Sequence, residues 1–234
     1  MLMQLLRGGL GDLEMAELLF QLAATVFVVL FALPLHECAH AWMAKKLGDN
    51  TAWMQGRVSL DPRRHLDPIG TAMIFLVGFG YAKPVPVNIR NFKKRQQYMA
   101  LTSLAGPVSN LLMGFVLMLF MQASYIVGFA IGMSDVWRYI YYFFECAAFI
   151  NISLAVFNLL PIPPLDGSRL LTLFLPPKLY YKVMQYERYV QIAVMFLLFF
   201  GVLTRPLSWL SGVVFNALDF VTVLPFRAFF AFSG

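Results

Sequence analysis

The sequence predicts an all-α polytopic membrane protein, and three observations lead to this prediction. Hydrophobic residues make up 60% of the 234-residue chain and charged residues only 13%. The mean hydropathy is +0.70, far above that of a soluble globular domain. Apolar runs recur along the chain, and most are long enough for a helix to cross roughly 30 Å of hydrocarbon. They cover residues 18–35, 101–130, 139–160, 192–203 and 207–223. We expect four to six membrane helices in a single domain, residues 1–234.

The distribution of Lys and Arg between the loops predicts how these helices are oriented. Ten lie between Lys45 and Arg95, four lie between Arg169 and Arg188, and one is Arg227. Because positively charged loops stay in the cytoplasm, the first helix should run inward, the second outward and the third inward. The last two apolar runs should then form an outward and inward pair. The net charge of +6 resides in these loops and no basic soluble domain is present, so we expect no nucleic-acid partner.

Residues 68–82 are apolar but are not expected to cross the membrane. The run is short, contains Gly70, Gly78 and Gly80, and has basic loops on both sides. These features favour a re-entrant or interfacial segment. The flanking residues 52–60 and 83–89 are partly β-branched and are interrupted by Gly and Pro. This favours short extended strands at the membrane surface, with an ordinary connecting loop as the alternative.

The sequence HECAH, residues 36–40, directly follows the first apolar run. Residues four apart on a helix differ by about 40° in direction, so His36 and His40 project from one face and can bind one metal ion. Glu37 lies beside them, which completes the H-E-x-x-H pattern of two zinc ligands and a carboxylate that can accept a proton from water. A metal ion also explains how ionisable groups are tolerated next to an apolar helix. The alternative is a pair of imidazoles that hydrogen-bond to neighbouring helices.

A catalytic zinc ion commonly has three protein ligands and an open position, so a third ligand is expected at the same depth. Asp166 fits, because the prolines of residues 161–164 end the third helix and free the chain to bend toward the metal. Glu145 competes poorly, because the intervening helical chain places it roughly 30 Å away. His65 is a stronger competitor, but it lies in a charged loop, where a solvated or loop-bracing His is the usual case.

With HECAH, SLAGPVSN at residues 103–110 and NLLPIPPLDG at residues 158–167 in this order, the sequence resembles the site-2 protease family of intramembrane zinc metalloproteases. The resemblance spans about residues 18–169. It implies a three-helix catalytic core with one zinc ion per chain, held by His36, His40 and Asp166. It also implies that Asn158 holds the substrate or the oxyanion, with a plain helix-terminal Asn as the alternative.

The resemblance also covers two structural features. It implies that residues 57–88 form a re-entrant, partly β-structured region that pairs with an unwound substrate. Gly106, Asn110 and Gly114 lie on one face of the middle core helix and permit close helix contact, which is a packing role. A C-terminal helical pair, about residues 188–230, should flank the core.

These features together predict a zinc-dependent endopeptidase that cleaves transmembrane segments of other membrane proteins, as in regulated intramembrane proteolysis. Its partners are then the lipid bilayer and transmembrane protein substrates. We expect it in a bacterial or archaeal plasma membrane with the active site toward the cytoplasm. The alternatives are a metal-ion transporter and a catalytically silent scaffold. The scarcity of acids in the apolar runs disfavours a transporter, and the presence of Glu37 disfavours a silent scaffold.

Overall fold

The computed structural model describes residues 12–77 and 80–233, and within them the chain is built from helices without a β-strand. Four helical stretches in these described ranges are long and apolar enough to cross a membrane. They are Met15–Lys46, Arg95–Ile131, Asp135–Leu159 and Thr204–Phe226. The prediction of an all-α polytopic membrane protein is therefore confirmed, and the number of spans lies within the predicted range. Gly78 is outside the described residues.

The first membrane stretch is one continuous helix with a change of winding in its middle. It consists of α2 (Asp12–Phe27), the π-helical turn η1 (Val28–Ala32) and α3 (Leu33–Lys46). Pro34 lies at the start of α3 and lacks the N–H that a regular helix would use there. The π-helical turn directly before it accommodates this missing bond without breaking the helix. HECAH therefore lies on the regular α-helix that follows the turn.

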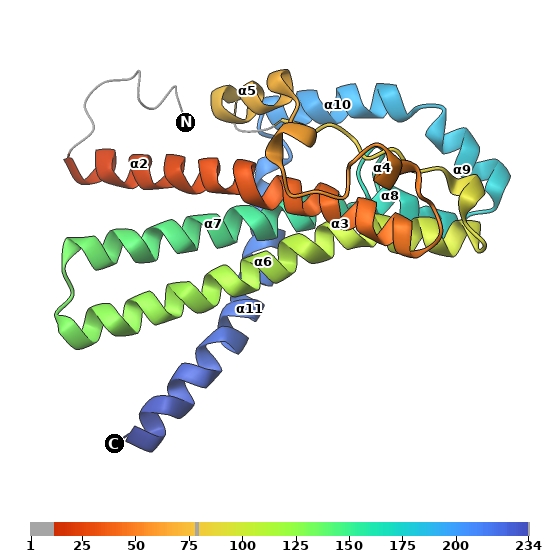
Figure 1. Ribbon diagram of the computed structural model, residues 1–234. Coiled ribbons are helices and arrows are strands. Elements are labelled where there is room, and N and C mark those ends of the chain that lie inside the picture. The colour runs from red at the N-terminus through yellow and green to blue at the C-terminus, as the bar shows by residue number, and fades with distance from the viewer. Residues whose placement is uncertain (1–11, 78–79, 234) are drawn as a thin grey trace.

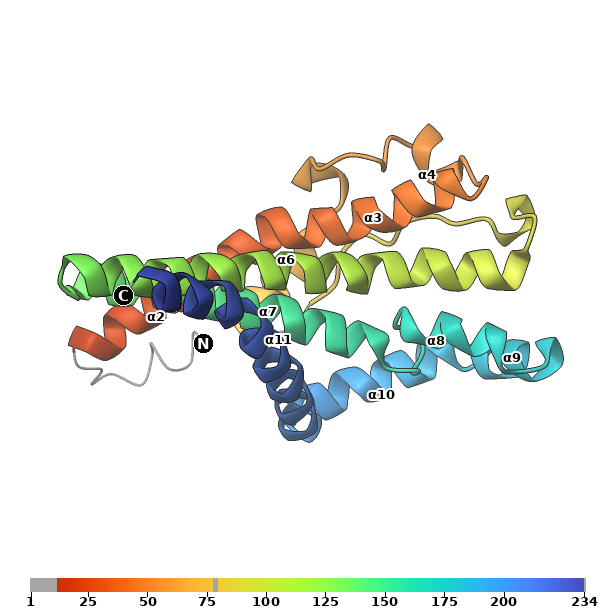
Figure 2. The same cartoon turned by 90° about the horizontal axis from the view of Figure 1, so that it is seen from below.

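The core is formed where this helix packs against α6 (Arg95–Ile131) and α7 (Asp135–Leu159). Helices α6 and α7 lie side by side, and the first helix crosses them, so that α2 packs on α7 and α3 packs on α6 (Figures 1 and 2). Small residues permit the close approach of the helices, since a Cβ atom added at Gly114 would lie 3.0 Å from Ile152 Cγ1. The buried cluster consists of Ala24, Leu117, Met118, Met121, Ala147, Ala148, Ile152 and Val156.

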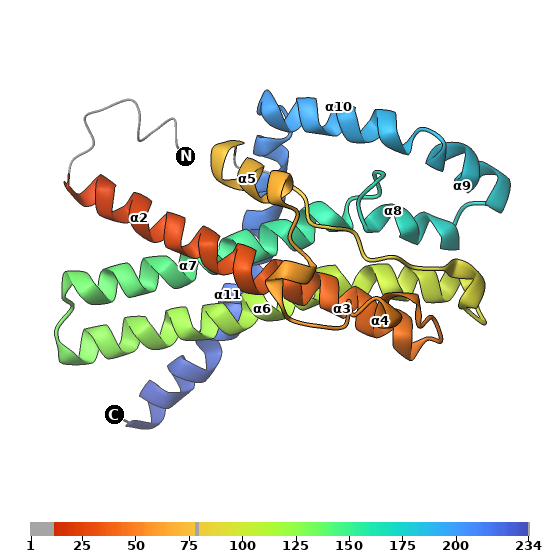
Figure 3. The same cartoon turned by 45° about the horizontal axis from the view of Figure 1, so that its top comes forward.

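Between α3 and α6, the part of the chain that the structure describes carries four short helical elements. These are α4 (Thr51–Met54), η2 (Pro62–Arg64), α5 (Pro68–Val77) and η3 (Ile89–Asn91). With ten residues, α5 is about 15 Å long, too short to cross the membrane. After α5 the chain returns and runs back to the start of α6 (Figure 3).

The two ends of the α5 segment meet. Leu66 and Ala82 form an isolated antiparallel bridge, and the Lys83 backbone N–H donates to the His65 carbonyl at 2.7 Å. A segment that begins and ends at one place enters and leaves from the same side. This geometry agrees with the re-entrant interpretation of residues 68–82.

The extended strands predicted beside this segment are not formed, so that part of the prediction is wrong. Residues 51–54 are helical, because the Asp49 carboxylate accepts a hydrogen bond from the Thr51 backbone N–H at 3.1 Å and starts a helical turn. Residues 83–88 have no regular secondary structure, and within the described chain their backbone hydrogen bonds beyond the bridge at Ala82 are those of Lys83 with His65 and Arg57 and that of Asn88 with Asp49. Pro84 and Pro86 have no N–H to donate to a ladder, which explains why no strand pair develops.

The chain after α7 forms α8 (Gly167–Leu170), η4 (Leu171–Leu173), α9 (Pro177–Met184), α10 (Glu187–Phe199) and α11 (Thr204–Ser233). The predicted outward and inward pair of crossings is wrong, because α10 has thirteen residues and is only about 20 Å long. Only α11 of the two is long enough to span the membrane. It packs on α6 and α7, and Gln122 Nε2 on α6 donates to Asp219 Oδ1 on α11 at 2.7 Å.

Candidate metal centre

Three side chains that are far apart in the sequence meet at one point beside α6. His36 and His40 come from α3, and Asp166 is the residue before α8. The two Nε2 atoms are 3.0 Å apart, and each lies 3.2 Å from Asp166 Oδ2. Among the described residues, this is the group of three His, Cys, Asp or Glu side chains whose ligand atoms lie close enough together to hold a metal ion.

The geometry of these atoms fits a zinc ion. Zinc binds imidazole nitrogen and carboxylate oxygen at about 2.0–2.1 Å in a tetrahedral arrangement, which places the ligand atoms roughly 3.3 Å from one another. The three observed separations, 3.0, 3.2 and 3.2 Å, are close to this value. Three protein ligands also leave one tetrahedral position open, as a catalytic site requires.

Helix α6 forms the floor of the site. His36 and His40 are 5% and 7% exposed, so both imidazoles are buried against it. A Cβ atom added at Gly106 would lie 2.6 Å from His36 Nε2 and would collide with His40 Nε2. The Thr102 carbonyl on the same helix is 2.7 Å from His40 Nδ1. A glycine is therefore required at position 106 for both imidazoles to occupy their places.

Asp166 reaches the imidazoles because the chain turns sharply after α7. Gly167 packs so tightly on the end of α7 that an added Cβ atom would collide with the Leu159 and Leu160 carbonyls. Burial acts to raise the pKa of the Asp166 carboxyl, but the adjacent His40 and His36 imidazoles outweigh burial and hold this pKa well below its usual range. The carboxylate is thus kept in the ionised form that binds a cation.

Glu37 lies next to the ligands on α3 and is half-buried. Its neighbours include Arg57, whose guanidinium donates to the Lys83 carbonyl, and His65, which is fully buried. Burial lowers the pKa of both Arg57 and His65, and the negative charge of Glu37 opposes this effect in both. The sequence analysis missed Arg57, since nothing in a charged loop indicates which Arg becomes buried.

The remaining predicted residues lie outside this group of three. Asn158 is half-buried on the last turn of α7 and makes no side-chain hydrogen bond to the three residues within the described chain. His65 Nε2 lies 2.7 Å from the Ser59 carbonyl, which is the loop-bracing role that the sequence favoured. Glu145 lies on α7 near Asp219, away from the site.

The comparisons with known proteins point to one family. The model of Peptidase family M50 matches residues 122–203, a range that includes Asp166 and begins after HECAH. YwhC of Bacillus subtilis, a protein named as a zinc metalloprotease, is 41% identical over 199 residues, which cover 82% of this chain and 85% of YwhC. The chain belongs to peptidase family M50, the site-2 protease family. It is a membrane protein of a zinc-dependent protease family, and the predictions of enzyme class and cofactor are confirmed.

More distant relatives agree with this assignment. Rip2 of Mycobacterium tuberculosis H37Rv, also named as a zinc metalloprotease, is 32% identical over 205 residues, which cover 84% of this chain and 75% of Rip2. MJ0611 of Methanocaldococcus jannaschii bears the same description and is 30% identical over 139 residues, 58% of this chain and 62% of MJ0611. No solved structure gives a significant match. A family of zinc metalloproteases leaves no support for the transporter and scaffold alternatives.

Proposed function

We propose that the protein is an intramembrane endopeptidase that hydrolyses peptide bonds in the membrane-spanning segments of other membrane proteins. One observation carries the proposal: His36 and His40 lie on a helix that is apolar enough to span a membrane, and their ligand atoms meet that of Asp166, which follows the end of another such helix. The first span, Met15–Lys46, has 32 residues and is about 48 Å long, and HECAH lies toward its second end. The site is then at the inner edge of the hydrocarbon region.

In this proposal His36, His40 and Asp166 hold one zinc ion. Zinc bound there supplies a Lewis acid that polarises the scissile carbonyl and activates water at neutral pH. Glu37 accepts the proton of the attacking water and passes it to the nitrogen of the leaving amine. The Asn158 carboxamide donates a hydrogen bond to the substrate backbone or to the oxyanion that forms on the carbonyl.

The substrate has to be unwound before cleavage, because a helix uses its own carbonyl and N–H groups in hydrogen bonds. We place the unwound segment along residues 83–88. Lys83 at the start of this stretch is hydrogen-bonded to His65 and Arg57, and the charge of Glu37 acts on both of these residues. Its unpaired backbone groups are available to a substrate strand, although Pro84 and Pro86 restrict such pairing to a few bonds.

The proposed location is the plasma membrane of a bacterium or archaeon, with the site toward the cytoplasm. The relatives come from bacteria and an archaeon. Ten of the Lys and Arg residues lie between Lys45 and Arg95, next to the site. Positively charged loops stay in the cytoplasm, which supports this orientation. A site at that depth suits the release of a cytoplasmic fragment in regulated intramembrane proteolysis.

Substitution of Glu37 tests the proposal. Glu37→Gln leaves the three ligands in place, so the purified variant should retain about one zinc ion per chain by elemental analysis. Its cleavage of a transmembrane substrate in proteoliposomes should fall by several orders of magnitude, because the proton acceptor is lost. Glu17→Gln, an exposed position on α2, is the matched control and should cleave like the parent.

Two results would contradict the proposal. Cleavage by Glu37→Gln at a rate close to that of the parent would show that Glu37 is not the base. Near-stoichiometric zinc in a His36→Ala, His40→Ala double variant would show that the metal is bound elsewhere.

A further inference from the structure

The two histidines of the metal centre differ in what their second ring nitrogen contacts. His40 Nδ1 is 2.7 Å from the Thr102 carbonyl, an acceptor that fixes the ring and leaves Nε2 free to bind metal. His36 Nδ1 is buried and has no hydrogen-bond partner in the described chain. A metal-binding His nearly always donates its second ring N–H to an acceptor, and a buried N–H without one is costly. His36 therefore requires an acceptor.

The register of α3 on α6 shows where to look for it. Thr102, Gly106 and Asn110 are spaced four residues apart and form one stripe along α6. Thr102 contacts His40, and a Cβ atom added at Gly106 would lie 2.6 Å from both Cε1 and Nε2 of His36. The His36 ring thus packs on the stripe at Gly106. Asn110 is the next residue of the stripe.

Asn110 is fully buried, and neither Oδ1 nor Nδ2 has a partner in the described chain. One turn further along the stripe, a Cβ atom added at Gly114 would lie 3.0 Å from Ile152 Cγ1 on α7. Asn110 therefore lies where the stripe passes from its contact with α3 to its contact with α7. Such a position gives no access to bulk water, so its carboxamide must be satisfied by groups of these three helices or by a buried water molecule between them.

A third group without a partner lies on α7. Asn151, the neighbour of Ile152, is fully buried; its Nδ2 donates to the Ala147 carbonyl at 2.8 Å, while its Oδ1 has no partner in the described chain. The donors and acceptors match. His36 Nδ1–H needs an acceptor, Asn110 has an acceptor oxygen and a donor NH2 group, and Asn151 has an acceptor oxygen.

We propose that Asn110 is a positioning residue of the metal centre: its Oδ1 accepts the Nδ1–H of His36, and its Nδ2 donates to Asn151 Oδ1, directly or across one buried water molecule. Asn110 then does for His36 what the Thr102 carbonyl does for His40. It fixes the tautomer in which Nε2 carries the lone pair and faces the metal. This assigns to Asn110 a role that helix packing alone would not need, and it rests on the proposed zinc ligands.

Zinc affinity measured by competition with a chelator tests this role. Asn110→Leu keeps the side-chain volume but removes the acceptor, and it should weaken zinc binding by about 10- to 100-fold. Asn110→Asp keeps an acceptor oxygen in the same shape and should bind zinc at least as tightly as the parent. Asn216→Leu, an exposed position on α11, is the matched control and should bind zinc like the parent. If Asn110→Leu binds zinc within about twofold of the parent, the inference is wrong.

A second measurement covers the case in which Asn110→Leu does not fold. In zinc-loaded protein labelled with ¹⁵N-histidine, the His36 Nδ1–H signal should be present in the parent and should shift downfield in Asn110→Asp, because a carboxylate is a stronger acceptor. An unchanged signal overturns the inference. Suppose that the parent cleaves substrate and binds zinc through His36, but that substitution of Asn110 changes neither the zinc affinity nor the His36 signal. That result contradicts this inference and leaves the proposed function untouched. A parent whose zinc does not depend on His36 contradicts the proposed function.

Discussion

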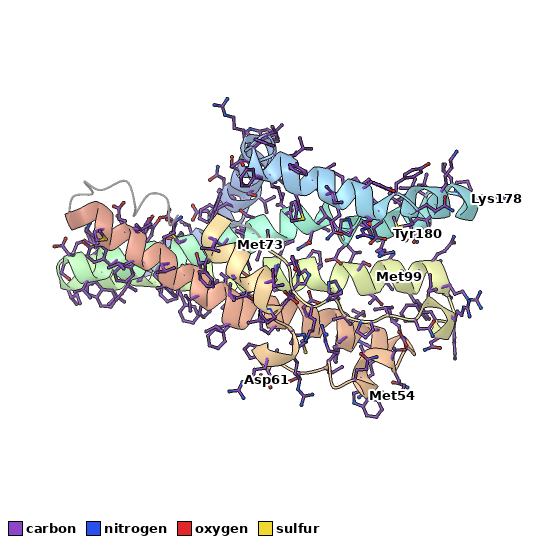
Figure 4. All side chains as sticks on the ribbon, turned by 90° about the horizontal axis from the view of Figure 1, so that it is seen from above. Met54, Asp61, Met73, Met99, Lys178 and Tyr180 are labelled. Atoms are coloured by element: carbon purple, nitrogen blue, oxygen red, sulfur yellow. The ribbon has the colours of Figure 1, made fainter. Side chains whose placement is uncertain are left out.

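The two faces of α3 are held in different ways. Toward α6, the contact is close helix packing, with Gly106 directly under the imidazoles of His36 and His40. On the other face, residues 49–93 are held largely by side chains that bind backbone groups. Asp49 accepts hydrogen bonds from the Asn88 backbone N–H and from Asn91 Nδ2, both at 2.7 Å, and Arg57 donates to the Lys83 carbonyl. Figure 4 shows Met54 and Asp61 projecting from this segment on the side away from α6.

Binding the metal is therefore separable from holding residues 49–77 and 80–93, the cover, against α3. The positions of His36 and His40, two of the proposed zinc ligands, follow from close helix packing, which leaves no space for an added methyl group at Gly106. The cover depends on individual hydrogen bonds, each worth about 1 kcal/mol, and can lose one without losing its fold. Substitutions on the first face should therefore remove zinc, and those on the second should spare it.

The largest effect is expected from Gly106→Ala. The added methyl group would occupy the space of both imidazoles, so zinc content and cleavage should both fall to background. Gly212→Ala on α11 is the matched control, because an added Cβ atom there has nothing within 4 Å, and it should behave like the parent. Elemental analysis and a proteoliposome cleavage assay measure both variants. A Gly106→Ala variant with full zinc content would show that α6 does not form the floor of the site.

A second pair of substitutions separates the roles of two residues at the junction between α7 and α8. Asp166→Ala removes a charged ligand, so zinc affinity and cleavage should both fall. Asn158→Ala should retain zinc and fold while cleavage falls roughly 10- to 1000-fold, as for the loss of an oxyanion donor. Zinc content and turnover measured side by side decide between the two roles. If Asn158→Ala lost zinc as readily as Asp166→Ala, Asn158 would support the metal and not the substrate.

The same contrast explains how much the sequence could predict. The spacing of His36 and His40 repeats with the helix period, and the apolar runs are long, so the membrane spans and the placement of the two imidazoles on one helix face could be predicted from local pattern. Asp166 followed from the prolines that end α7. These features depend on residues that are near one another in the sequence, or on the expectation that the third ligand lies at the same membrane depth as the first two.

The features that were missed depend on contacts between distant segments. The burial of Arg57 and the positioning role proposed for the Asn110 carboxamide depend on how distant segments pack together. No local sequence pattern contains this information. The predicted strands do not form because Pro84 and Pro86 interrupt strand pairing, although the β-branched residues around them favour an extended strand. The prediction that residues 192–203 cross the membrane was wrong because α10, with thirteen residues, is too short to span it.

The smallest effect is expected on the cover side of α3. Asp49→Asn turns one acceptor oxygen into a donor that faces other donors, so it should lower the free energy of unfolding by about 1–3 kcal/mol while zinc content stays unchanged. Asp135→Asn is the matched control, since that carboxylate is largely exposed and its ion pair with Arg138 contributes little. Thermal unfolding of the zinc-loaded proteins in detergent measures both.

The pH dependence of this difference tests whether the Asp49 charge is the cause. Burial acts to raise the pKa of Asp49, but the hydrogen bonds from Thr51, Asn88 and Asn91 outweigh it and lower the pKa below its ordinary value. A lowered folded-state pKa stabilises the fold fully above the unfolded value of about 3.9 and loses this contribution as the pH falls through the folded value. The difference between parent and Asp49→Asn should therefore stay constant from pH 7 to about pH 5 and shrink only below about pH 4. A difference that already declines between pH 7 and pH 5 would assign the effect to another group, since a carboxylate with a lowered pKa stays ionised throughout that range.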